Sequence, residues 1–290
     1  MSKRSRARKE RELEQQWLDY IKEHRVAYAR NWERGNAAKF EEDGHYEWMA
    51  KFVDGYETVL EIGTGTGQGT RALLERGHTV ISIDENPLCV ERATKYLETT
   101  GGRVIAESRE NITTNEQGYN ISYIRPKAIP VEQGALLLEG DIIDDPSLIE
   151  WLSVGRSIDA IVCWLIGSHN ARELNSLFLT KRVRNPGEYR LCVQNRVYEI
   201  ADKLLRLGGI LHIVDRGEDI SQEFLREDVE HAHRDQASVT TLIVESIEQR
   251  LYEEPNQPKS IPMTTTIGLS GRVPEIVKPA LVSIISRKPA

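Results

Sequence analysis

A glycine-rich segment near the start of the chain has the residue types that hold a nucleotide or a cofactor. Residues 61–69 read EIGTGTGQG. A strand-like run at 58–62 leads into this segment and a helix-favouring run at 70–76 follows it, so the glycines occupy a turn between a strand and a helix. A ligand can approach the backbone closely in such a turn because glycine has no Cβ atom. The pattern predicts a ligand-binding loop.

The spacing of these glycines distinguishes between two classes of ligand. A dinucleotide-binding turn has the pattern G-x-G-x-x-G. Counted from Gly63, the last position of that pattern is Gln68, and counted from Gly65 it is Thr70, so the pattern fails in both frames. The chain has instead an acidic residue, Glu61, followed by glycines at every second position. A nicotinamide dinucleotide is therefore disfavoured.

Further acidic residues follow two other predicted strands. Asp84, with Glu85 beside it, ends the strand-like run 79–83. A carboxylate at that place can accept hydrogen bonds from both hydroxyl groups of a ribose. Asp141 follows the next predicted strand and Gly140, although it could also cap the helix after it, because Asp is a favoured N-cap residue. Ligands bind outside the carboxyl ends of parallel strands, so we expect these acids near the glycine loop.

This combination resembles the motifs of the class I S-adenosylmethionine-dependent methyltransferases, over about residues 58–214. The resemblance implies that the chain binds S-adenosylmethionine and releases S-adenosylhomocysteine. Glu61 would help to hold the ammonium group, although it could also be a plain charge at the end of a strand. Asp141 would accept a hydrogen bond from the adenine amine, and the Ile142 amide would serve a ring nitrogen. The resemblance implies cofactor contacts by Glu61, Gly63, Thr64, Gly65, Gly67, Asp84, Glu85, Asp141 and Ile142.

The rest of the chain alternates strands and helices, which predicts a doubly wound α/β fold. With the resemblance, we expect a Rossmann-like, mostly parallel, seven-stranded sheet with an antiparallel C-terminal edge. Residues 1–54 would form an N-terminal helical extension, and 55–290 the methyltransferase domain. Residues 101–134 exceed the usual length of a connection and predict an inserted flap with a hairpin. A helix is expected over 198–207, before a strand at 209–214.

Composition and charge limit the cellular setting and the partners. Hydrophobic residues make up 39% of the chain and charged residues 29%, which is typical of a folded, water-soluble protein. The apolar runs are too short to span a membrane, and no secretory signal begins the chain, so we expect a cytoplasmic protein. The three cysteines form no C-x-x-C pair, and no metal site is predicted. Residues 1–11 carry six basic residues and one acidic residue, whereas the whole chain has a net charge of −7. The rest of the chain is therefore strongly acidic, which disfavours nucleic acid as a partner.

The loop after the fourth predicted strand bears on the methyl acceptor. Residues 163–170 read CWLIGSHN, which departs from the [D/N/S]-P-P-[Y/F/W] signature with which relatives hold planar nitrogens. We therefore expect a small molecule or a protein side chain as the acceptor. His169 is the candidate base, because imidazole titrates near neutral pH, although a lone histidine is often structural. Asp215 and Glu218 are weaker candidates for binding the acceptor.

Two alternatives concern the N-terminal aromatic residues and the function as a whole. Tyr46 and Trp48 could cover the cofactor, or they could pack a helix against the core. The chain could also be a methyltransferase-like cofactor-binding or scaffold protein that has the fold without catalysis, since the loop at 163–170 has no distinctive acceptor motif.

Overall fold

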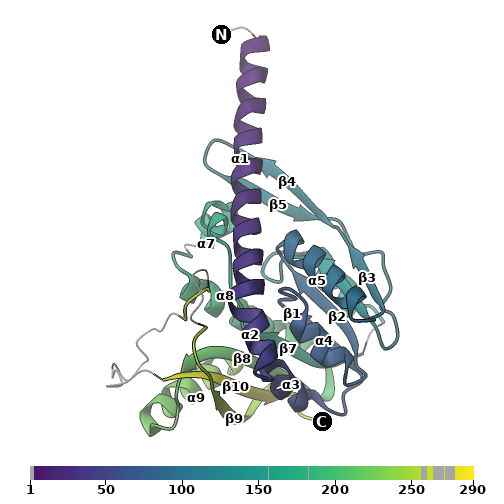
Figure 1. The fold of residues 1–290 in the computed structure, drawn as a ribbon, viewed down its shortest axis with the longest axis vertical. Helices are drawn as coiled ribbons and strands as arrows, with labels where there is room; N and C mark the ends of the chain where they lie inside the picture. Colours follow the sequence, from purple (N-terminus) through teal and green to yellow (C-terminus); the bar gives the residue numbers. More distant parts are fainter. Residues whose placement is uncertain (1–2, 156, 182, 256–259, 264–270, 272–277) are drawn as a thin grey trace.

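A sheet of eight strands runs through the centre of the molecule (Figure 1). The structure is a computed structural model that describes residues 3–155, 157–181, 183–255, 260–263, 271 and 278–290. Six of the strands run parallel to one another. In spatial order the strands are β3 (Val104–Glu107), β6 (Ala135–Glu139), β2 (Thr79–Asp84), β1 (Thr58–Ile62), β7 (Ile158–Trp164), β8 (Leu205–Glu218), β10 (Pro279–Arg287) and β9 (Ile243–Leu251).

The antiparallel edge of the sheet comes from the C-terminal part of the chain. β10 lies between β8 and β9 and runs antiparallel to both. The predicted fold class, a doubly wound and mostly parallel α/β sheet with an antiparallel C-terminal edge, is confirmed. The sheet has one strand more than the seven predicted, because β3 from the segment 101–134 pairs with β6.

Helices bury both faces of the central parallel strands β6, β2, β1 and β7, which explains why these strands read as nearly continuous apolar runs. α4 (Gln68–Leu74) and α5 (Pro87–Thr99) pack on one face, and α6 (Pro146–Ser153) and α8 (Pro186–Leu204) on the other. Side chains alternate between the faces along a strand. In β1, Val59 joins the core under α4 and α5, whereas Leu60 and Ile62 join the core under α8.

The helix expected over 198–207 ends earlier than predicted. α8 ends at Leu204, and β8 begins at Leu205, which pairs with Ile158 of β7. The register between β7 and β8 shifts beyond this pair, and Gly208 has a φ of +77° there, so the chain continues as a strand through the two glycines. Pairing with β7 therefore outweighs the helical preference of residues 205–207.

The N-terminal extension consists of a long helix followed by short helical turns. α1 (Lys3–Asn31) runs past the rest of the molecule at its N-terminal end, as Figure 1 shows, while its C-terminal half packs on the body. η1 (Trp32–Ala37), α2 (Ala38–Glu42), α3 (His45–Ala50) and η2 (Lys51–Val53) complete the extension. No helix in the described part of the chain is both long and apolar enough to cross a membrane.

The segment 101–134 contains an edge strand and a hairpin. After β3, the strands β4 (Glu110–Thr114) and β5 (Tyr119–Tyr123) pair with each other as a two-stranded antiparallel sheet. Arg109, at the base of this hairpin, is 1% exposed. Its guanidinium donates to the Asp145 carboxylate at 2.8 Å and to the carbonyl oxygens of Glu139 and Ile124, both at 2.7 Å. A buried ion pair therefore anchors the hairpin to the start of α6, and the hydrogen bond to Glu139 connects it to β6.

Removal of this anchor should destabilise the protein strongly. Arg109→Ala would leave the Asp145 carboxylate buried without its cation, so we expect the free energy of unfolding to fall by ~3 to 5 kcal/mol. Arg125→Ala, in the same segment, removes an exposed ion pair with Glu150 and should cost at most ~1 kcal/mol. Urea unfolding of the two variants measures the difference. An equal, small loss in both would show that the hairpin is not anchored through Arg109.

Candidate functional site

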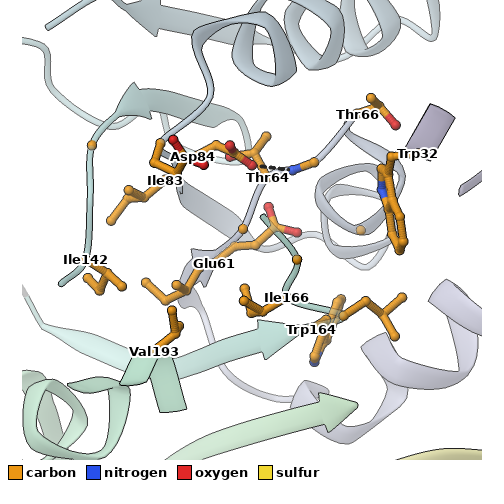
Figure 2. A pocket seen from close by; sticks show the side chains of 18 of the residues that line it. Trp32, Glu61, Thr64, Thr66, Ile83, Asp84, Ile142, Trp164, Ile166 and Val193 are labelled. Carbon is orange, nitrogen blue, oxygen red and sulfur yellow. Dashed lines mark hydrogen bonds between the residues drawn. The ribbon is translucent and has the colours of Figure 1, made fainter. Parts of the chain in front are cut away.

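A cavity lies at the carboxyl ends of the parallel strands, beside the glycine loop between β1 and α4 (Figure 2). The space between its walls, including open solvent at its mouth, is about 800 Å³. Gly67 lies outside the lining and faces α5, where a Cβ atom on it would be 3.1 Å from the Cα atom of Ala93. The other residues predicted to contact a cofactor all line the cavity: Glu61, Gly63, Thr64, Gly65, Asp84, Glu85, Asp141 and Ile142.

Backbone hydrogen bonds hold the glycine loop against β2. The amides of Gly63 and Thr64 donate to the carbonyl oxygen of Ile83, at 2.8 and 3.2 Å. Gly63 has a φ of +89°, and a Cβ atom there would be 2.7 Å from Cδ1 of Ile166. This position therefore needs glycine for both its backbone conformation and its close contact.

Asp84 connects the end of β2 to the glycine loop. Its Oδ2 atom accepts a hydrogen bond from the Gly65 amide at 2.8 Å, and its Oδ1 atom accepts one from the Asn86 amide at 2.9 Å. Burial raises the pKa of Asp84 to about 7, and the nearby Glu85 carboxylate adds to the effect. The two amides fix the orientation of the carboxylate and leave lone pairs of both oxygens available to a ligand.

Glu61, near the end of β1, is a buried carboxylate of the cavity, whereas Asp84 is partly buried. Its Oε2 atom accepts hydrogen bonds from the Thr70 and Ser82 hydroxyl groups, at 2.5 and 2.6 Å. Burial raises the pKa of Glu61 to about 7, although these two hydrogen bonds oppose the rise. The partners that the structure shows for Glu61 and Asp84 are hydroxyl groups and backbone amides, and none of them is a cation.

Ile142, next to Asp141 in the chain, lies across the cavity from Trp32 (Figure 2). Figure 2 shows Ile142 near Ile83 and Val193, which together make this end apolar. The Asp141 carboxylate accepts hydrogen bonds from the Ile143 amide at 2.9 Å and from Arg172 at 2.6 Å. Asp141 does not cap α6, because Asp145 is the N-cap residue of that helix.

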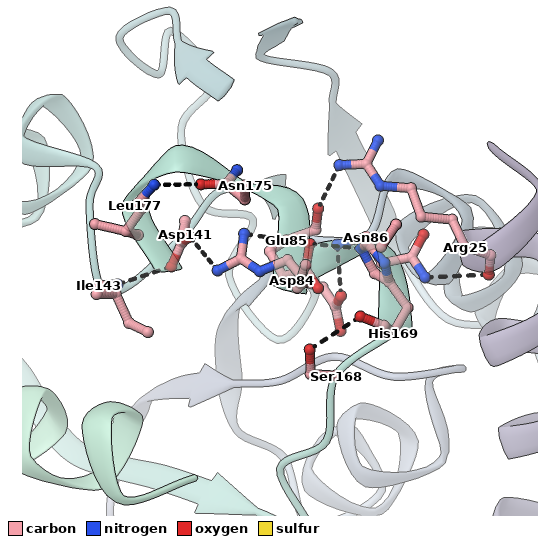
Figure 3. Close-up of polar contacts among 12 residues, drawn as sticks. Arg25, Asp84, Glu85, Asn86, Asp141, Ile143, Ser168, His169, Asn175 and Leu177 are labelled. Atoms are coloured by element: carbon pink, nitrogen blue, oxygen red, sulfur yellow. Dashed lines mark hydrogen bonds and ion pairs between the residues drawn. The ribbon is translucent and has the colours of Figure 1, made fainter. Parts of the chain in front are cut away.

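His169 lies in a buried charged cluster behind this cavity (Figure 3). Its Nε2 atom is 3.4 Å from Oε2 of Glu85, and Nη1 of Arg172 is 3.7 Å from the same oxygen. Burial opposes the charge of Glu85, but His169, Arg172 and Arg25 together hold its pKa well below the ordinary range. Burial lowers the pKa of His169 despite the neighbouring Glu85. The His169 imidazole is therefore close enough to Glu85 to help position its carboxylate.

The predicted base and the two candidate acceptor-binding residues are not gathered at the cavity. His169 lines a neighbouring cavity of about 320 Å³, which shares Tyr189 with the first one. Asp215 accepts a hydrogen bond from Gln194 at 2.5 Å, and neither Asp215 nor Glu218 lines the first cavity. The role of His169 in catalysis stays a prediction. Within the described residues, no three His, Cys, Asp or Glu side chains are grouped as metal ligands would be.

Three aromatic side chains from the N-terminal extension form one wall of the cavity. Tyr28 of α1, Trp32 of η1 and Tyr46 of α3 all line it. Trp48 instead packs on Phe52, with ring centroids 5.3 Å apart. Our sequence analysis did not assign Tyr28 and Trp32 to the site, although aromatic residues four positions apart on a helix lie on one face and could have indicated a shared contact.

Comparisons with known proteins identify similar folds and no family. No protein-family model matches the chain, and no curated protein sequence matches it. Many of the solved structures that match are S-adenosylmethionine-dependent methyltransferases. At identities of 11–14% and TM-scores below 0.5, we base no functional assignment on them. The sheet order and the glycine loop already show that the chain has the Rossmann-like fold that its resemblance to class I methyltransferases implied.

Three of these structures illustrate the degree of similarity. The N-methyltransferase NodS from Bradyrhizobium japonicum, in complex with S-adenosyl-L-homocysteine, is 12% identical, with a TM-score of 0.46 over 89% of this chain and 91% of that one. A putative sarcosine dimethylglycine methyltransferase from Galdieria sulphuraria is 12% identical, with a TM-score of 0.42 over 84% of each chain. An rRNA methylase from Streptococcus thermophilus is 14% identical, with a TM-score of 0.41 over 85% of this chain and 95% of that one.

The raised pKa of Glu61 should make the ligand-free protein less stable as the pH rises. The ordinary pKa of this carboxyl is 4.5 and its folded value is about 7. Between these values the folded state holds a proton that the unfolded state has released, so the free energy of unfolding falls with rising pH. Glu61→Gln can still accept hydrogen bonds from Ser82 and Thr70 but does not ionise. We expect this variant to be more stable than wild type above pH 7, by up to about 3 kcal/mol.

Urea unfolding at several pH values checks this prediction. The advantage of Glu61→Gln should shrink as the pH is lowered from 7 and disappear below pH 4.5, where the carboxyl is protonated in both the folded and the unfolded state. Glu75→Gln, an exposed position at the end of α4, serves as the control and should show no such dependence. A difference between Glu61→Gln and wild type that is the same at every pH would contradict the assignment.

Proposed function

We propose that the chain binds S-adenosylmethionine and transfers its methyl group to an acceptor. The observation that carries this proposal is the pair of carboxylates Glu61 and Asp84, the first buried and the second partly buried, which line one cavity and have no cationic partner in the described structure. Ionising a carboxylate away from water with no cation beside it costs free energy. A ligand that brings positive charge and hydroxyl groups satisfies both side chains, and S-adenosylmethionine carries a sulfonium, an ammonium group and a ribose.

The cavity has a suitable partner for each part of this cofactor. Its apolar end, with Ile83, Ile142 and Val193, suits the adenine ring, and the Asp141 carboxylate beside it can accept from the exocyclic amine. Asp84 can accept from the ribose hydroxyl groups. Glu61 can pair with the ammonium group through its Oε1 atom, for which the described structure shows no hydrogen-bond partner.

The chemistry requires alignment of the acceptor and exclusion of water. When bound, the cofactor supplies a methyl group on a sulfonium, which is transferred by in-line displacement. The extension covers the cavity with Tyr28 and Trp32, and the loop after β7 contributes Ile166 and Gly167 to the wall. His169 remains our proposed base or acceptor-positioning residue, and its contact with Glu85 connects it to the cofactor cavity.

Binding and turnover test this function separately. S-adenosylmethionine should raise the free energy of unfolding, by ~2.7 kcal/mol at 100 times its dissociation constant. When the protein and S-adenosylmethionine with a labelled methyl group are added to a cell extract, a component of the extract should become labelled. Binding without any transfer would favour the cofactor-binding scaffold. A lack of binding by the folded protein, or preferential binding of a nicotinamide dinucleotide, would overturn the proposal.

Asp84→Ala should weaken cofactor binding while the protein stays folded. The substitution removes the proposed acceptor of the ribose hydroxyl groups and the carboxylate that positions the Gly65 amide, so we expect a loss of ~10- to 100-fold in affinity. Calorimetric titration with S-adenosylhomocysteine measures it. Asp54→Ala is the control, because Asp54 forms an exposed ion pair with Arg76 far from the loop, and it should bind as wild type does. Wild-type affinity in Asp84→Ala would mean that the ribose is not held at β2.

A further inference from the structure

The cavity is larger than its adenosine-binding end, and its other end is aromatic. Four of the aromatic residues that line the cavity are Tyr28, Trp32, Tyr46 and Trp164, while a fifth, Tyr189, lies on α8 with Val193. Figure 2 shows Trp32 and Trp164 across the cavity from Ile142 and Val193. A Cβ atom on Gly65 would be 3.1 Å from Nε1 of Trp32, so the indole lies directly against the glycine loop. These four residues are called the aromatic end below.

The charges that line the cavity have one sign. Among its described lining residues the ionic groups are carboxylates, namely Glu61, Asp84, Glu85 and Asp141, and there is no Lys, Arg or His. Arg172 lies behind two of them, 2.6 Å from Asp141 and 3.7 Å from Glu85, and partly neutralises both.

Two other arginines lie close to the cavity without lining it. Arg25 pairs with Glu110 at 2.9 Å, on the far side of Glu85. The Arg216 guanidinium is 5.9 Å from the centre of the Trp32 ring and 3.8 Å from Glu254, which offsets its charge. The surface that a ligand meets therefore favours cations, through carboxylates at its centre and aromatic rings at one end.

The sign of this surface distinguishes between classes of methyl acceptor. A hydroxyl or carboxyl acceptor attacks as an oxyanion, which buried carboxylates would repel and which no lining cation would stabilise. An acceptor bearing phosphates meets the same repulsion. A neutral amine carries no negative charge at any stage, and its product is a cation that aromatic faces and carboxylates both attract.

We propose that the aromatic end binds the methyl acceptor as a neutral amine, so that the protein is an amine N-methyltransferase. This inference rests on the proposed function. The amine nitrogen donates its lone pair to the methyl carbon, the bond from carbon to sulfur breaks, and sulfur keeps that electron pair. Positive charge moves from sulfur to nitrogen, and the new ammonium then loses a proton to solvent. The total charge in the cavity stays constant during the transfer, so the same groups stabilise it throughout.

A matched pair of probes tests the preference for cations at the aromatic end. Choline and its uncharged isostere 3,3-dimethylbutanol have the same shape, and choline resembles a methylated amine product. The protein saturated with S-adenosylhomocysteine should bind choline, or a peptide containing trimethyllysine, at least ~10-fold more tightly than the uncharged isostere. A response to choline indicates a small amine acceptor, and a response to the peptide alone indicates a protein side chain.

Variants of Trp32 show whether the preference comes from this part of the cavity. Trp32→Leu should lose the preference for the cation, and Trp32→Phe should keep most of it. Trp17→Leu, the same substitution at a residue of α1 that does not line the cavity, should behave as wild type.

The prior titration with S-adenosylhomocysteine separates the two proposals. If it does not bind, the proposed function fails and the amine inference fails with it. If S-adenosylhomocysteine binds, two results overturn the amine inference alone. One is that the uncharged alcohol binds as tightly as choline, and the other is that neither cationic probe binds. Loss of the preference in Trp17→Leu as well as in Trp32→Leu would also overturn it.

Discussion

The constraint on which the site depends is a pair of carboxylates, one buried and one partly buried, that have no cationic partner in the described structure. Glu61 and Asp84 end neighbouring strands at the centre of the sheet, where burial raises the pKa of both to about 7. The protein offsets the cost with hydroxyl groups and backbone amides, which orient a carboxylate without neutralising it. The site is therefore prepared for a ligand that brings the missing positive charge.

The rest of the architecture surrounds this pair. The parallel strands bring β1 and β2 to the same edge of the sheet, and the glycine loop passes close enough for Asp84 to accept from its backbone. The N-terminal extension adds an aromatic wall. Arg172, in the segment after β7, pairs with Glu85 at the end of β2 and with Asp141 after β6, and so holds this segment beside the two strands. The lining thus comes from segments far apart in the chain.

The local patterns of the sequence predicted the centre of the fold and of the site. The strand at 58–62 has the predicted bounds, because its apolar run, buried on both faces, ends sharply at a glycine. The glycine spacing and the acids after two strands predicted the lining of the cavity, since these residues lie directly at the strand ends. The resemblance to methyltransferases added the cofactor that such a lining would hold.

Features that depend on tertiary contacts could not be predicted in this way. The eighth strand forms because Val104–Glu107 reaches β6, and the end of α8 moves because Leu205 pairs with β7. Arg172 approaches Asp141 and Glu85 from a segment whose local sequence shows no sign of this contact. The sequence correctly predicts that His169 lies in a loop after a strand. The orientation of its side chain toward Glu85 depends on the path of that loop.

The central claim is that a cationic cofactor completes the Glu61 and Asp84 pair. Carbon-13 NMR of the side-chain carboxyl groups, with Glu61→Gln and Asp84→Ala for assignment, measures their pKa values in the free and bound protein. The account predicts values near 7 in the free protein and a clear fall for Glu61 with S-adenosylmethionine bound, because a nearby positive charge favours the ionised form. An unchanged or higher pKa of Glu61 in the complex would contradict it.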